Sequence, residues 1–119
     1  IMLGTFVLSA EYNEAYFSKA QKIRRIIQEK TKEIFKKYDF ILSPTTPHTA
    51  FDIGKKQIDP TTMYLEDVFT VQANLTGNPA ISIPLTKHSN KLPIGIQLMA
   101  DHFQEAELLS FCDYISRKC

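Results

Sequence analysis

The sequence predicts an α/β fold in which helices pack on a small mixed sheet of about three strands. Long segments with apolar residues at steps of three and four, typical of amphipathic helices, alternate with shorter apolar segments. Residues 40–42 form a short apolar run without alternation, which is typical of a strand covered on both faces. Residues 80–85 and 93–100 alternate apolar and polar side chains on either side of a polar loop, which predicts an antiparallel hairpin.

The length of 119 residues fits one domain, and we expect residues 1–119 to form a single, partial one whose sheet is the edge of a larger sheet. A formal net charge of +1 gives no electrostatic reason for direct binding to nucleic acid or to an anionic membrane. No apolar run approaches the ~20 residues that a membrane-spanning helix needs. Cys112 and Cys119 lack disulfide-framework or metal-binding spacing, so we expect reduced thiols in a cytoplasmic protein.

The segment before the first predicted strand is expected to be mainly helical. Residues 1–9 are compatible with two turns, and an amphipathic helix is predicted over residues 11–38. Lys and Arg crowd its outer face, which raises the alternative of a surface for nucleic acid or membrane. Acidic residues are interspersed and aromatic residues do not interleave, so a solvated face is the favoured interpretation.

A second helix is predicted to begin with Thr61 or Thr62 as its N-cap and to end at Gly77 in a left-handed conformation. Asp67 lies among its apolar positions, whereas Glu66 is displaced from them by about 100 degrees and is expected to face solvent. The apolar positions are Tyr64, Val68, Val71 and Leu75.

The connections predict how these elements meet. The strand at 40–42, through Ile41, is expected to pair in parallel with Ile83 of the strand at 80–85, through a right-handed crossover that contains the second helix. A last helix is predicted over residues 104–116, with Asp101 as its N-cap and Cys112 as a core thiol.

Asp67 is the strongest candidate for a ligand-binding residue. A carboxylate that faces inward needs an ion partner or hydrogen bonds, because desolvation otherwise favours its neutral form. The partner of Asp67 is either a Lys or Arg of the same protein or the ammonium group of a ligand, such as the α-amino group of an amino acid. The spacing alone leaves both alternatives open.

The remaining candidates for chemistry are weaker. Ser43, in the loop SPTTP, has neither a glycine elbow nor an assigned base, so a turn-capping serine is the favoured interpretation. The spacing of His48, His88 and His102 matches no compact metal motif, and no metal site is expected. Asp101 and His102 are adjacent and could form an acid–base pair in principle.

Four blocks of the sequence resemble consecutive C-terminal blocks of the amidase signature family. They are IMLGTFVLSAEYNEAYFSKAQKIR, YDFILSPTTP, MYLEDVFTVQANLTGNPAISIPL and LPIGIQLMA. These blocks cover nearly the whole chain, and several in order are more specific than any single one. Glu11, where glycine is expected, and Gln72, where proline is common, depart from the family pattern.

The resemblance implies an α/β sandwich with a mixed central sheet, of which this chain would be a C-terminal portion. The family nucleophile is a serine, assisted by a second serine in a cis peptide and by a lysine. In the family these segments precede the matched blocks, so no catalytic residue is expected in this chain. Asp67 matches the aspartate of the family's MYxxD block, and the resemblance implies that it holds the ammonium group of glutamine.

Within the family, the blocks are most similar to the glutamine-hydrolysing A subunits of tRNA-dependent amidotransferases. The resemblance implies that such a protein passes ammonia to a B subunit, which uses ATP and Mg²⁺ to convert Glu-tRNA(Gln) to Gln-tRNA(Gln), and that a small C subunit helps the complex to assemble. This chain would need no cofactor of its own, would be inactive alone and would self-associate through its exposed sheet rim. Two alternatives stay open, another hydrolase of the same family and a freestanding interaction domain.

Overall fold

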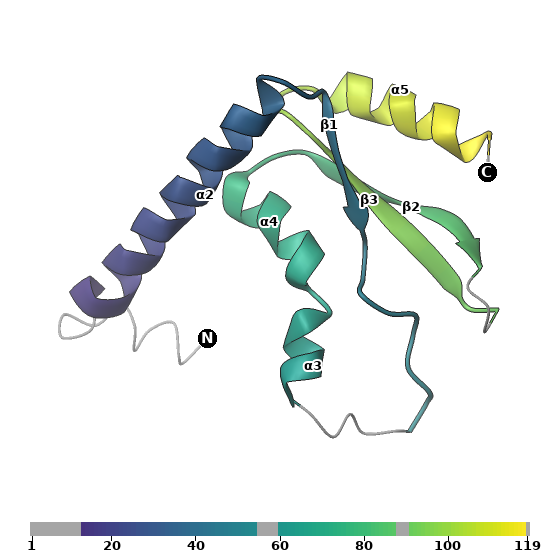
Figure 1. Cartoon of the computed structure of the whole chain (residues 1–119), viewed down its shortest axis with the longest axis horizontal. Coiled ribbons are helices and arrows are strands. Elements are labelled where there is room, and N and C mark those ends of the chain that lie inside the picture. Colours follow the sequence, from purple (N-terminus) through teal and green to yellow (C-terminus); the bar gives the residue numbers. More distant parts are fainter. Residues whose placement is uncertain (1–12, 55–59, 88–90, 119) are drawn as a thin grey trace.

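The computed structural model describes residues 13–54, 60–87 and 91–118, and it confirms an α/β fold with three strands (Figure 1). The helix expected over residues 1–9 lies outside the described residues. None of the described helices combines the length and apolar character that a membrane crossing requires. In chain order the elements are η1 (Asn13–Ser18, π-helical), α2 (Lys19–Phe35), β1 (Phe40–Pro44), α3 (Pro60–Leu65), α4 (Val68–Thr76), β2 (Ala80–Lys87), β3 (Pro93–Ala100) and α5 (Glu105–Ser116).

Strand β3 lies in the centre of the sheet, antiparallel to both neighbours, in the order β1-β3-β2. The predicted hairpin of β2 and β3 is confirmed. The predicted parallel pairing of Ile41 with Ile83 is wrong, and the described strands do not form a mixed sheet: Ile41 pairs with Met99, and Ile83 with Ile96. The helical connection between β1 and β2 makes these two strands run in the same direction, but it does not require them to be neighbours in the sheet. The short hairpin loop keeps β3 beside β2, and β3 offers its other edge to β1.

One face of the sheet is apolar and packs against α5. Cross-strand partners on an antiparallel pair share a face, so Leu98 and Ala100 of β3 lie on the same side as Ile83 of β2. Leu98 is only 1% exposed, and the core that it forms includes Leu108 and Cys112 of α5. This cluster is the hydrophobic core of the described part of the chain.

The other face is polar at its centre. Gln97 of β3 lies directly opposite Ser43 of β1 and Ser82 of β2, and the three form a line across the sheet that we call the polar row. Because adjacent residues of a strand point to opposite faces, the polar row lies on the side away from Leu98. The side chain of Gln97 reaches α4 on this side.

Helix α2 projects away from the sheet (Figure 1). The continuous helix predicted over residues 11–38 is π-helical in η1 and α-helical only in α2. Only Thr31 of α2 is buried, and Ile23 is 50% exposed. The radius of gyration is 17.6 Å, against about 13.5 Å for a compact chain of this length. Much of the apolar stripe of α2 therefore remains uncovered.

Two predicted N-caps are wrong. Helix α3 begins at Pro60, so Thr61 and Thr62 both lie inside it. Proline suits the first helical position because an N–H there would have no helical partner. Helix α5 has Gln104 as its N-cap, and the carbonyl of Asp101 accepts the N–H of Gln104 at 3.2 Å in a turn that precedes the helix.

Candidate functional site

The predicted second helix is interrupted between α3 and α4 (Figure 1). Asp67 lies at this break, at the N-terminus of α4. Helix α3 ends at Leu65, and α4 begins at Val68 with Asp67 as its N-cap residue. The carbonyl of Asp67 accepts the N–H of Thr70 at 3.1 Å and the N–H of Val71 at 3.0 Å. Its carboxylate makes no capping hydrogen bond and is exposed.

The prediction that Asp67 faces inward is therefore wrong for this structure. It assumed one continuous helix with a step of about 100 degrees per residue, and the break at Glu66 and Asp67 interrupts that phase. No Lys or Arg among the described residues pairs with Asp67, so the intramolecular ion pair is not formed there. The carboxylate is open to a cation from outside these residues, and its role in substrate binding stays a prediction.

Glu66, which was expected to face solvent, is half-buried. Its side chain is 26% exposed, and its Oε1 lies 3.3 Å from Nδ1 of His48 in the segment that follows β1. The hydroxyl of Thr46 donates to the carbonyl of His48 at 2.7 Å and supports this turn. The pair was invisible in the sequence because its members are 18 residues apart on different elements. It connects the break between α3 and α4 to the loop after β1.

The polar row lies beneath the first turn of α4. Gln97 is 7% exposed, and its Nε2 donates to the carbonyl of Phe69 at 2.9 Å. The hydroxyls of Ser82 and Thr45 are hydrogen-bonded to each other on the same face of the sheet. Gly95 leaves room for them, because a Cβ at that position would stand 3.1 Å from Oγ1 of Thr45. Side-chain polarity is thus concentrated between the sheet and the N-terminus of α4.

The prediction that Ser43 caps a turn is wrong, because Ser43 belongs to the polar row. It is half-buried inside β1, opposite Gln97. Among the described residues no base hydrogen-bonds to it, so this surface offers polar contacts to a ligand but no activated nucleophile.

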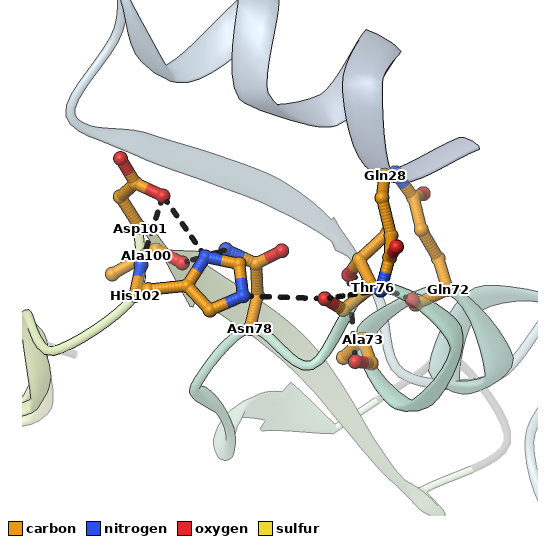
Figure 2. A network of polar contacts seen from close by, with 8 residues as sticks. All are labelled: Gln28, Gln72, Ala73, Thr76, Asn78, Ala100, Asp101 and His102. Atoms are coloured by element: carbon orange, nitrogen blue, oxygen red, sulfur yellow. Dashed lines mark hydrogen bonds and ion pairs between the residues drawn. The ribbon is translucent and has the colours of Figure 1, made fainter. Parts of the chain in front are cut away.

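The other end of α4 is held by a hydrogen-bond network (Figure 2). Gly77 has a φ of 79°, which confirms the left-handed helix end. Nε2 of His102 donates to the carbonyl of Thr76 at 3.2 Å. Nδ2 of Asn78 donates to the carbonyl of Ala100 at 2.9 Å. The network joins the last turn of α4 to the end of β3.

Asp101 and His102, the adjacent acid–base candidates, serve this network. Oδ1 of Asp101 accepts the backbone N–H of His102 at 2.8 Å, and this hydrogen bond holds the pKa of Asp101 below its ordinary value. Nδ1 of His102 lies 3.3 Å from the same oxygen. Because Nε2 of His102 is bonded to the helix end, the pair stabilises structure and does not present a free base.

The remaining candidates offer no second centre. Across residues 13–54, 60–87 and 91–118, no group of three or more His, Cys, Asp or Glu side chains could hold a metal ion. His88 and Cys119 lie outside the described residues. Cys112 is a buried core thiol, as predicted, and burial raises its pKa. A raised pKa disfavours the reactive thiolate, so Cys112 acts as a packing residue.

A cavity of about 790 Å³ lies between the end of α2, β1 and α5. Aromatic and acidic side chains line it, and Phe40 stacks on Phe111 with 4.7 Å between the ring centroids. Neither Asp67 nor the polar row contributes to its walls. The cavity is therefore separate from the surface around the N-terminus of α4.

Comparison with known proteins agrees with the resemblance seen in the sequence. The amidase family model matches residues 1–109. The A subunit of glutamyl-tRNA(Gln) amidotransferase from Halothermothrix orenii is 53% identical over 109 residues, which are 92% of this chain and 23% of that protein. The A subunit of the same enzyme from Chlorobium limicola is 46% identical over 118 residues, which are 99% of this chain and 25% of that protein.

Comparison with solved structures points to the same family. The crystal structure of the glutamyl-tRNA(Gln) amidotransferase A subunit from Thermotoga maritima superimposes with a TM-score of 0.73 and 53% sequence identity, and the match covers 87% of this chain and 23% of that chain. The chain spans about a quarter of the length of the curated relatives it matches. With the family model matched over nearly its whole length, the chain belongs to the amidase family.

Proposed function

We propose that this chain is the glutamine-binding, C-terminal part of an A subunit of glutamyl-tRNA(Gln) amidotransferase. Such a protein hydrolyses glutamine and supplies ammonia for the conversion of Glu-tRNA(Gln) to Gln-tRNA(Gln). The observation that carries the proposal is the identity of 46–53% to proteins of that name along 92–99% of the chain.

The proposed division of labour follows from what the chain contains. It offers a substrate-binding carboxylate at Asp67 but no nucleophile with a base among the described residues, so the serine–lysine chemistry belongs to other parts of the subunit. The chain alone is then inactive. ATP and Mg²⁺ are used by a B subunit, a C subunit completes the complex, and the assembly works in the cytoplasm.

Asp67 is the residue of this chain that we assign to glutamine. Its carboxylate is exposed and has no ionic partner among the described residues. An α-ammonium group presents three N–H donors to such a carboxylate, and charge-assisted hydrogen bonds of this kind are about twice as strong as neutral ones. The side-chain amide of the same glutamine would then point toward catalytic groups from the rest of the subunit.

The test uses the full-length subunit in its complex, with ammonia release from glutamine as the assay. Asp67→Asn should raise the KM for glutamine roughly 10- to 150-fold, the equivalent of about 1.5–3 kcal/mol for one charge-assisted contact. The matched control is Glu66→Gln, which removes the neighbouring carboxylate that pairs with His48 and should change KM less than threefold, by about 0.6 kcal/mol at most.

Two results would contradict the proposal. An unchanged KM in Asp67→Asn would remove Asp67 from the site. Faster hydrolysis of uncharged amides than of glutamine would make the parent protein a general amidase of the same family.

A further inference from the structure

Helix α4 is held in place by hydrogen bonds more than by apolar packing. Val68 and Val71 are 49% and 42% exposed, and only Ala73 and Thr76 among its nine residues are buried. A helix of this length is not stable by itself in water, so its position depends on contacts with the rest of the fold.

The hydrogen bonds from other elements are unevenly distributed along α4. Its last turn has several: Arg24 Nε donates to the carbonyl of Leu75 at 2.8 Å, and Gln28 and His102 both reach the carbonyl of Thr76. Figure 2 shows these side chains converging on the helix end, except for Arg24, which is not drawn. The last turn of α4 is therefore anchored redundantly.

The middle and the first turn of α4 each make one hydrogen bond with another element. Gln72 in the middle donates to Oγ1 of Thr31 on α2 at 3.2 Å. In the first turn, within the described part of the chain, the only hydrogen bond from another element is that of Gln97 Nε2 to the carbonyl of Phe69, at 2.9 Å. Gln97 is buried in the central strand, which is paired on both sides, so it is a rigid anchor.

We propose that Gln97 is a positioning residue that holds Asp67 in its ligand-binding position through the first turn of α4, an inference that rests on the proposed role of Asp67. The carbonyl it binds is two residues from Asp67, in the same turn. The break between α3 and α4 leaves Asp67 without support from a continuous helix on its N-terminal side. Without Gln97, the first turn would shift or fray while the last turn stays anchored.

The test compares two matched substitutions in the full-length subunit in its complex. Gln97→Met keeps the length of the side chain but removes its donor, and it should raise the KM for glutamine about tenfold with kcat within threefold. Gln72→Met removes the hydrogen bond to Thr31 and should change KM less than threefold, since a partly buried hydrogen bond of similar strength is lost farther from Asp67. Gln97→Leu, which also lacks a hydrogen-bond donor, is the second variant and should raise KM by a similar factor.

A substrate analogue separates positioning from a general loss of structure. Glutaramate has the amide and the carboxylate of glutamine but no α-ammonium group, so it cannot use Asp67. Its inhibition constant should be the same for Gln97→Met and for the wild type. In the double variant Asp67→Asn with Gln97→Met, the KM for glutamine should equal that of Asp67→Asn alone.

Each outcome decides between the two proposals. If Asp67→Asn leaves KM unchanged, both the role of Asp67 and the role of Gln97 are refuted. If Asp67→Asn raises KM while Gln97→Met does not, only the positioning role is refuted. The positioning role alone is also refuted if Gln97→Met raises the inhibition constant of glutaramate as much as the KM for glutamine. It is refuted as well if the KM increase in the double variant is the product of the increases in the two single variants.

Discussion

The two faces of the sheet hold their helices by different forces. Against α5, Leu98 and Ala100 bury apolar surface together with Leu108. Against α4, Gln97 makes a directional hydrogen bond to one carbonyl. Apolar burial scales with area and tolerates small displacements, whereas a hydrogen bond specifies the position of individual atoms. The α5 face therefore stabilises the fold, and the α4 face is suited to hold a ligand-binding residue in place.

The strongest test of this comparison lies at Leu98, which neighbours Gln97 in β3 and points to the opposite face. Leu98→Ala should lower the free energy of unfolding by about 2–5 kcal/mol, because it opens a cavity beside Leu108 and Cys112. Urea unfolding of the full-length subunit measures the difference. Molecules that remain folded should keep the wild-type KM for glutamine. A KM change as large as that of Gln97→Met would show that the two faces are not independent.

A smaller effect is expected at the anchored end of α4. Gly77 has a φ of 79°, where an L side chain is strained, so Gly77→Ala should destabilise the subunit by about 1–2 kcal/mol. A Cβ there would stand 3.6 Å from Nε2 of His102, an ordinary contact, so the cost comes from the backbone and not from a clash. Gly77→Asn is the control and should cost less, because Asn tolerates this conformation. Equal melting temperatures for the Ala and Asn variants would contradict the backbone explanation.

The smallest effect concerns Asp101. The folded-state pKa of Asp101 lies below its ordinary value of 3.8, so its ionised form stabilises the fold. The contribution is present above the ordinary pKa and is lost as the pH falls through the lowered one. Its side chain is 43% exposed, and solvent screening limits the effect to about 0.5 kcal/mol.

Asp101→Asn keeps an acceptor for the N–H of His102 and removes only the charge. The melting temperature of the variant should be slightly below that of the wild type at neutral pH and equal to it at the acidic end of a pH series. A difference that persists in acid would mean that the charge of Asp101 is not its source.

Local features of this protein were predictable from the sequence. The hairpin followed from the alternation of apolar and polar residues. The helix end followed from Gly77, because glycine enters the left-handed region freely. The buried thiol of Cys112 followed from the helical spacing of apolar residues. Asp67 was singled out because a carboxylate among apolar positions is chemically unusual. Its orientation was not predictable, because the break at Glu66 and Asp67 leaves no mark in the apolar pattern.

By itself, the sequence determined the class of fold, the family and the elements whose patterns repeat over two to four residues. Only the tertiary structure decided that β3 lies between β1 and β2, that Glu66 pairs with His48, and that Gln97 holds the first turn of α4. Periodicity reports which side of an element is apolar, because that depends on neighbours in the chain. The two hydrogen bonds join partners 18 and 28 residues apart, and β1 pairs with residues of β3 that are 52 to 60 positions away. Nothing in the local pattern identifies those partners.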